Sequence, residues 1–212
     1  MLQKSSRFPG LAGPVVTIVM DGYGLPANEV GSAIAAARKP TLDRLFAQYP
    51  NISLRAHGTA VGMPSDEDMG NSEVGHNALG AGQVYAQGAA LVADAIASGA
   101  IWAGEAWQQI VAAAKAGPAG TLHFIGLFSD GNVHSHIDHL QAMIARARDE
   151  GVRRVRVHVL LDGRDVPETS ALEYIEPFEA FLAGVRSADF DVAIASGGGR
   201  QVITMDRYEA NW

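Results

Sequence analysis

Residues 69–76, Met-Gly-Asn-Ser-Glu-Val-Gly-His, present one hydroxyl group in surroundings that suit a catalytic nucleophile. Ser72 has the amide of Asn71 and the carboxylate of Glu73 beside it, and glycines lie on either side of the group. Glycines let the backbone turn tightly and bring a hydroxyl close to a ligand. A serine stays a weak nucleophile until a base, a lowered pKa or a metal activates it. The same residues also fit a helix start with Asn71 or Ser72 as the N-cap, so this segment alone leaves both interpretations open.

Asp21 could hold the metal that would activate such a serine. It follows residues 14–20, Pro-Val-Val-Thr-Ile-Val-Met, a short β-branched run that predicts a buried strand. A carboxylate at the end of a buried strand can ligate a divalent cation, and it can equally cap the next turn. Taken with Ser72, Asp21 favours a metal-activated serine alkoxide, which is the arrangement that phosphoryl transfer through a phosphoserine needs.

Charged side chains follow three further predicted strands, at the point where each strand ends. In open α/β sheets, ligands bind outside the carboxyl ends of the strands. Guanidinium groups, supported by glycine amides, suit a small and multiply charged anion that carries phosphate or carboxylate. The residues that these strand ends bring to one edge are His134, Arg164, Asp165, Arg200 and Arg207.

Several of these groups also have a simpler interpretation. The histidine-rich stretch 134–139 resembles a metal cluster, although histidines near a helix start more often form hydrogen bonds. Asp162 and Asp165 could simply shape a turn, without any role in binding. Residues 197–199, Gly-Gly-Gly, lack the spacing of a dinucleotide fingerprint, so we predict no nucleotide cofactor. Residues 66–68, Asp-Glu-Asp, fit a solvated acidic turn better than a metal loop.

The elements that must position these residues alternate regularly after Gly120. This succession of strand, helix, strand, helix and strand predicts an α/β fold with a parallel sheet and right-handed βαβ crossovers. We expect strands at 121–128, 153–161 and 191–195 and helices at 137–150 and 170–182.

The first half of the chain is less regular. Pro40 should interrupt the helical pattern of residues 33–46. A glycine-spaced passage near residues 80–88 predicts a domain boundary, which divides the chain into domains 1–87 and 88–212. The other elements expected in this part are a strand at 51–56 and helices at 89–98 and 105–116.

The composition excludes several classes of function. The chain has 212 residues with a formal net charge of −7, which argues against a nucleic-acid binder that relies on bulk electrostatics. No apolar run is long enough to span a bilayer, so no membrane partner is expected. The absence of cysteine excludes thiolate chemistry and fits a reducing compartment. Residues 1–14 lack the apolar core of a secretory signal. We therefore expect a cytoplasmic protein.

The motifs occur in the order found in a known enzyme family. They are Asp-Gly-Tyr-Gly at 21–24, the nucleophile segment continued to residue 82, and the segments 129–136, 161–165 and 205–207. From about residue 15 to 212, the chain closely resembles the N-terminal part of cofactor-independent (2,3-bisphosphoglycerate-independent) phosphoglycerate mutases. The acidic residues 66–68 and the seven-residue spacing from Arg200 to Arg207 resemble the plant and trypanosomatid branch. Tyr23 stands where the family usually has tryptophan.

The resemblance implies an alkaline-phosphatase-like α/β domain, whose first portion is 1–87. This domain is interrupted by an α/β phosphotransferase domain, of which 88–212 is the first portion. Ser72 would take the phosphoryl group from 3-phosphoglycerate and return it to the other hydroxyl of the glycerate. Asp21 and Ser72 would ligate one of two divalent metal ions, with manganese favoured over magnesium, cobalt or zinc. Neither 2,3-bisphosphoglycerate nor a nucleotide would be needed.

The same resemblance implies that the strand-end residues hold the glycerate and its phosphate. These are His134, Arg164, Asp165, Arg200 and Arg207. Members of the family are much longer, and the remaining metal ligands would lie in a C-terminal half that this sequence lacks. That half is therefore a candidate partner, and a full-length protein would be a monomer. We expect the 212-residue chain to be inactive by itself.

Two other functions are compatible with the sequence. One is a metal-dependent phosphatase, or another phosphomutase of the alkaline phosphatase superfamily. Arg164, Asp165 and Arg200 favour the mutase, because a simple phosphatase does not need to clamp a glycerate. The other is a non-catalytic anion-binding fragment, which would keep the arginines but would not use Ser72 as a nucleophile.

Overall fold

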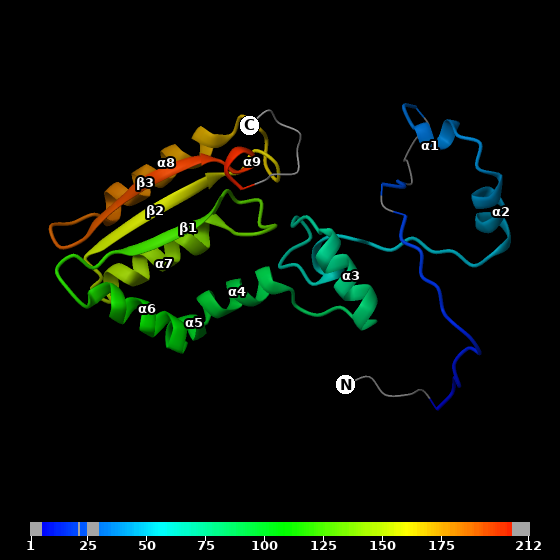
Figure 1. The fold of residues 1–212 in the computed structure, drawn as a ribbon, viewed down its shortest axis with the longest axis horizontal. Coiled ribbons are helices and arrows are strands. Elements are labelled where there is room, and N and C mark those ends of the chain that lie inside the picture. The colour runs from blue at the N-terminus through cyan, green and yellow to red at the C-terminus, as the bar shows by residue number, and fades with distance from the viewer. Residues whose placement is uncertain (1–5, 21, 25–29, 205–212) are drawn as a thin grey trace. The chain divides into compact units, whose positions relative to one another are not determined.

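The computed structural model describes residues 6–20, 22–24 and 30–204. The chain forms two compact units, Met1–Ser53 and Leu54–Trp212. In the first unit, helix α1 (Ala33–Ala36) is capped by Ser32, whose Oγ accepts a hydrogen bond from the Ala35 amide. Helix α2 (Pro40–Gln48) begins at Pro40, where the missing amide proton costs no helical hydrogen bond. The predicted helix with a break at Pro40 is confirmed (Figure 1).

The strands predicted at residues 14–20 and 51–56 are absent, which corrects the sequence interpretation. Neither segment has regular secondary structure. Their apolar side chains face solvent, with 79% exposure at Ile18 and 84% at Ile52. A strand requires neighbours that accept and donate its backbone hydrogen bonds. Within the described residues, neither segment is paired in a ladder, so an apolar β-branched pattern was not sufficient to make a strand.

The second unit contains the predicted parallel sheet. Strands β1 (Leu122–Phe128), β2 (Arg154–Leu161) and β3 (Asp191–Gly199) lie in the order β1-β2-β3. Both pairs are parallel, with a register irregularity between Val157 and His158. Strand β3 extends four residues past the predicted end. There Gly197 approaches β2 so closely that a Cβ atom would lie 2.5 Å from a methyl group of Val159.

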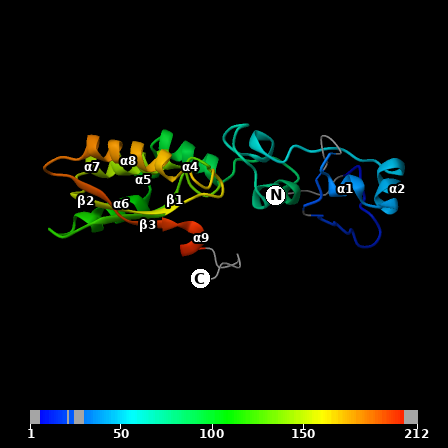
Figure 2. The same cartoon turned by 90° about the horizontal axis from the view of Figure 1, so that it is seen from above.

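Helices α7 (Ile137–Asp149) and α8 (Ala171–Val185) lie on the same face of the sheet (Figure 2). Alternation along β2 explains this arrangement, because every second side chain is a buried valine while the intervening residues are partly exposed. Both helices were predicted within a few residues of these bounds. The core that they close with the sheet includes Phe128, Ile144, Val155, Val157, Phe178, Leu182 and Val192.

The remaining elements of the second unit precede the sheet, except for α9. They are η1 (Gly58–Val61), α3 (Ser72–Ala81), α4 (Gly88–Ala97), α5 (Ala100–Ala103), α6 (Glu105–Lys115) and α9 (Arg200–Ile203). Trp107 of α6 joins the sheet core, whereas Val61, Met63 and Val74 form a small second cluster near α3. No described helix is long and apolar enough to cross a membrane. The chain divides after Ser53 into units that are each compact. This division does not test the domain boundary predicted at 87/88, which stays a prediction.

Candidate active site

Ser72 is the first residue of α3, and its hydroxyl is not used to cap the helix. The cap is Asn71, whose Oδ1 accepts a hydrogen bond of 3.0 Å from the Val74 amide. Ser72 is exposed, at a helix end whose unpaired amides and dipole favour an anion. Of the two N-cap candidates in the sequence, the structure selects Asn71. Ser72 is therefore available for chemistry.

His76 contacts Ser72 from the next turn of α3, a contact that we did not predict. Its Nδ1 lies 2.7 Å from the Ser72 carbonyl oxygen and 3.2 Å from Ser72 Oγ. A carbonyl oxygen can only accept, so Nδ1 carries the proton and donates it. An Nδ1 that is already protonated cannot remove the proton of the Ser72 hydroxyl. His76 thus orients the Ser72 hydroxyl, and the i, i+4 spacing was the signal for this contact.

Asp162 organises the carboxyl end of β2. Its Oδ2 accepts a hydrogen bond of 2.6 Å from Ser129 Oγ at the end of β1. Its Oδ1 accepts from Nη1 of Arg200 at 2.9 Å and from the amides of Arg164 and Asp165. The same Nη1 lies 2.7 Å from Oδ2 of Asp165. Asp162, for which the sequence also allowed a simple turn role, is therefore the centre of a buried network across all three strands.

This network shifts the pKa values of its two central charged groups, Asp162 and Arg200. Burial raises the pKa of Asp162, but hydrogen bonds from Ser129, Arg200 and two amides outweigh it and hold the pKa below its usual value. Burial also lowers the pKa of Arg200, and its contacts with Asp165 and Asp162 more than compensate, so this pKa is raised. Both groups are therefore ionised at neutral pH.

The predicted strand-end residues have different positions in the structure. Asp165 and Arg200 form an ion pair, and the exposed Arg164 lies in the loop between Asp162 and Asp165. His134 lies in the loop after β1 and lines a pocket. Asp21 and Arg207 lie outside the described residues, so their predicted roles stay predictions.

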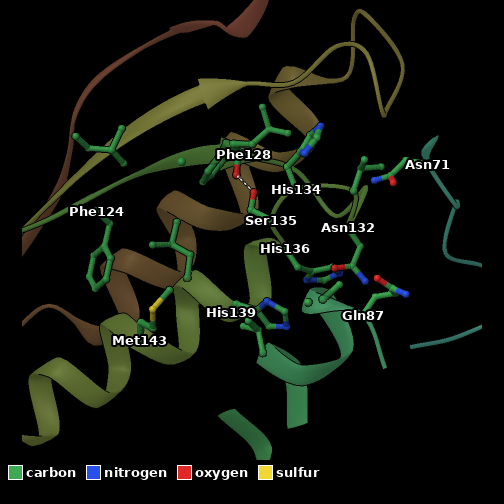
Figure 3. Close-up of a pocket in the computed structure, with 18 of the residues that line it drawn as sticks. Asn71, Gln87, Phe124, Phe128, Asn132, His134, Ser135, His136, His139 and Met143 are labelled. Atoms are coloured by element: carbon green, nitrogen blue, oxygen red, sulfur yellow. Dashed lines mark hydrogen bonds between the residues drawn. The ribbon is translucent and has the colours of Figure 1, made fainter. Parts of the chain in front are cut away.

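The pocket beside His134 has a volume of about 440 Å³ and a polar and an apolar end. Figure 3 shows Asn132, His136 and Gln87 near one end, with Phe124 and Met143 at the other. His139 also lines this pocket. Burial is the main cause that lowers the pKa of His139, and the nearby His136 is the second. Such a pocket can hold a small polar ligand against an apolar wall.

In the histidine-rich stretch 134–139, His136 forms a hydrogen bond within its own helix start rather than binding a metal cluster. Nδ1 of His136 accepts the Asp138 amide proton and caps α7. Among the described residues, no group of three or more histidines, aspartates or glutamates could hold a metal ion. The predicted ligand Ser72 therefore does not belong to a complete metal site within this part of the chain. A metal site at Ser72 would require ligands from outside the described residues.

Tyr174 provides a test of the loop after β1, because it contacts Asp130, the residue that follows Ser129. Its hydroxyl donates a hydrogen bond of 2.6 Å to Asp130, and burial together with the Asp130 carboxylate raises the pKa of Tyr174 to about 12. A raised pKa in the folded state stabilises the fold below the ordinary tyrosine pKa of 10. We expect that stabilisation to be lost as the pH rises from 10 to about 12.

The measurement compares the wild type with Tyr174→Phe. The spectrophotometric titration of the wild type should contain one phenol with a midpoint near 12 that the variant lacks. The difference in unfolding free energy between the two proteins should shrink over the same pH interval. A missing phenol that titrates near 10 would contradict the assigned contact.

The family of the chain follows from comparison with known proteins. A family model described as "BPG-independent PGAM N-terminus" matches residues 92–212, more than half of the chain. The chain belongs to this family. A protein of Leptospira interrogans named "Probable 2,3-bisphosphoglycerate-independent phosphoglycerate mutase" is 53% identical over 213 aligned residues, which cover the whole chain and 39% of the relative. The chain thus spans well under half the length of this relative.

Plant and trypanosomatid members of the family are also similar. A 2,3-bisphosphoglycerate-independent phosphoglycerate mutase of Trypanosoma brucei brucei is 48% identical over 93% of the chain and 36% of the relative. The crystal structure of Leishmania mexicana phosphoglycerate mutase at low cobalt concentration matches with a TM-score of 0.75 and 51% identity. That match covers 84% of this chain and 32% of the Leishmania chain. The resemblance stated from the motifs is confirmed.

Proposed function

We propose that the chain is the nucleophile-bearing part of a cytoplasmic phosphoglycerate mutase that interconverts 3- and 2-phosphoglycerate in glycolysis and gluconeogenesis. Family membership and the names of the relatives support the reaction. The observation that carries the proposal is the exposed Ser72 hydroxyl at the start of α3, which Asn71 leaves free by taking over the cap. The substrate is a small anion, and neither 2,3-bisphosphoglycerate nor a nucleotide takes part.

The proposed reaction has two balanced steps through Ser72. In the first, Ser72 Oγ forms a bond to the phosphorus of 3-phosphoglycerate, the bond to the C3 oxygen breaks, and that oxygen gains the proton that Ser72 loses. In the second, the C2 oxygen of the re-oriented glycerate forms a bond to the phosphorus of the phosphoserine, the bond between phosphorus and Ser72 Oγ breaks, and Ser72 gains the proton that the C2 hydroxyl loses. The amides at the start of α3 stabilise the phosphoserine dianion between the two steps.

Strand-end side chains hold the substrate in this proposal. His134 would contact it from the pocket, and Arg164, Asp165, Arg200 and Arg207 would bind the glycerate and its phosphate. Nη1 of Arg200 already donates to two carboxylates. An incoming phosphate must therefore use the other guanidinium nitrogens or displace Asp165. Because one guanidinium nitrogen is already occupied, a bound phosphate would be held in one orientation instead of rotating freely.

Divalent metal ions remain part of the proposal, although the described residues do not form a complete site. Two ions are expected, and manganese is favoured by the resemblance to the family, because the hard oxygen atoms of Asp21 and Ser72 would suit magnesium equally well. Bound there, an ion would lower the pKa of the Ser72 hydroxyl. The other ligands would come from the part of a full-length monomeric mutase that this chain does not span.

A chimera tests the proposed function. In it, this chain replaces the aligned part of the Leptospira interrogans relative, which is 39% of that protein. We expect the chimera to convert 3-phosphoglycerate to 2-phosphoglycerate in the presence of manganese. An inactive chimera that binds manganese and unfolds cooperatively would overturn the proposal.

The isolated 212-residue chain should lack this activity. Phosphoryl transfer depends on positioning and charge neutralisation, and half of the clamp is missing from the chain. We expect a rate at least about 10³-fold below that of the chimera at equal concentration. Enolase-coupled assays of both proteins measure this difference. Comparable rates would show that the described residues are sufficient for catalysis.

A further inference from the structure

The loop that leads to Ser72 is held together by Asp68. Its Oδ2 accepts hydrogen bonds of 2.7 Å from both the amide and the hydroxyl of Ser65. Its carbonyl oxygen accepts the Gly58 amide proton at 3.0 Å. The acidic residues 66–68 thus form an ordered turn in which Asp66 and Glu67 are exposed, as the sequence predicted, and Asp68 is half-buried. Asp68 lies four residues before Ser72, the first residue of α3.

The second carboxylate oxygen of Asp68 reaches a distant loop. Oδ1 accepts a hydrogen bond of 2.6 Å from Nδ2 of Asn132, which is 64 residues away in the sequence. Asn132 has a φ of 53°, and within the described part of the chain it is the sole residue other than glycine with positive φ. Asparagine tolerates this left-handed conformation better than most residues. The backbone at this position therefore aims the amide toward Asp68.

The loop that carries Asn132 is anchored to the strand-end network on its other side. Ser129 donates to Asp162 at 2.6 Å, and the Gly131 amide donates to Ser129 Oγ at 3.3 Å. A Cβ atom on Gly131 would lie 3.1 Å from Cβ of Asp165, so the loop packs tightly there. Hydrogen bonds and close packing therefore run without interruption from the Ser72 loop through Asn132 to Asp162 and Arg200.

We propose that the Asp68–Asn132 hydrogen bond is a positioning contact that sets the separation between Ser72 and the residues that bind the substrate phosphate. This role rests on the proposed function. Neither residue needs to touch the substrate, because each acts through the loop that it holds. A nucleophile must approach phosphorus to about 3 Å, and a displacement of about 1 Å costs on the order of 100-fold in rate.

The charge state of Asp68 fits this role. Burial raises the pKa of Asp68, but hydrogen bonds from Asn132 and Ser65 outweigh burial and leave the pKa below its usual value. The nearby His136 acts in the same direction. At neutral pH, Asp68 is therefore an ionised acceptor for both loops, and this bond is charge-assisted.

Reciprocal substitutions test the contact in the 212-residue chain. Asn132→Asp places two carboxylates together, and Asn132→Gly keeps the positive φ without a donor. The double variant Asp68→Asn with Asn132→Asp restores a bond in the reverse direction, and the remaining oxygen at position 68 can still accept from Ser65. Glu67→Gln is the matched control, because within the described part of the chain the exposed Glu67 carboxylate has no hydrogen-bond or ion-pair partner, and it lies on the same loop.

Hydrogen exchange reports whether the contact joins the two loops. Both single variants at Asn132 should raise amide exchange in residues 65–71 and 129–136 together, by about tenfold or more. The double variant should return both segments toward wild type, and Glu67→Gln should change neither. Faster exchange in residues 129–136 alone, or no recovery in the double variant, would overturn the contact.

Kinetics of the chimera separate positioning from simple loss of structure. Asn132→Asp should lower kcat about 100-fold with a change in KM of less than about threefold, and the double variant should recover most of kcat. An active chimera in which Asn132→Asp keeps its kcat would overturn the positioning role alone. A folded but inactive wild-type chimera would overturn the proposed function and this role together.

Discussion

Replacing Ser72 by alanine in the chimera should abolish the conversion of 3-phosphoglycerate to 2-phosphoglycerate. We expect kcat to fall by about 10⁴-fold or more, because removal of an attacking nucleophile leaves only binding and electrostatic contributions. Exposed and not used for capping, Ser72 Oγ is the hydroxyl at the start of α3 that can form the phosphoserine. The variant should also fail to incorporate radioactive phosphate from labelled 3-phosphoglycerate into protein.

The control for this variant lies one residue earlier. Ser72→Ala should leave the unfolding free energy nearly unchanged, since Asn71 supplies the cap. Asn71→Ala should instead cost about 1 kcal/mol through loss of that cap. Mutase activity within about tenfold of wild type in a folded Ser72→Ala chimera would assign the nucleophile to another residue.

The second half of the fold could be predicted because its signals are local. Strand β1 is a short apolar run, β2 alternates valines with polar residues, and the helix between them has its own periodicity, so no distant information was needed. Residues 14–20 carry an equally good strand pattern. They are nevertheless exposed and unpaired within the described structure. An apolar pattern predicts which side chains are buried. A strand also requires a neighbouring strand to pair with, and the sequence of one segment does not specify that neighbour.

The candidate site shows the same division between local and distant information. Strand ends pointed to Asp165 and Arg200, because parallel strands bring their carboxyl ends to one edge. The role of Asp162 was missed, since an aspartate followed by glycine is also ordinary turn chemistry. The bond between Asp68 and Asn132 crosses 64 residues and has no local signature. Only the folded arrangement shows that these residues connect the nucleophile loop to the strand ends.

Replacing Arg200 by methionine should destabilise the second unit more than any surface change. The variant leaves two carboxylates, Asp162 and Asp165, without the cation that lies within 3 Å of both. The side chain of Asp162 has no exposed surface, so water cannot solvate its charge. Breaking a buried ion pair from one side costs about 3–5 kcal/mol. Urea unfolding followed by circular dichroism measures this loss.

Acid should reduce the difference between wild type and Arg200→Met. The pKa of Asp162 in the folded wild type is lowered, so its stabilising contribution is present above the ordinary aspartate value of 3.8 and is lost as the pH falls through the lower folded value. The cost of Arg200→Met should therefore be largest near pH 7 and shrink below pH 3.8. Asp162→Asn combined with Arg200→Met should recover part of the lost stability at pH 7, because one uncompensated charge is removed.

Arg148→Met is the matched control for the arginine side chain. Arg148 pairs with Asp149 at 2.8 Å on the surface, with 39% of its side chain exposed, so its loss should cost less than about 1 kcal/mol. If Arg200→Met were equally mild and independent of pH, the carboxylates would have to be neutral or hydrated in the folded state. The strand-end network could not then hold Arg200 in place for an anion, and the binding role proposed for this edge would be lost with it.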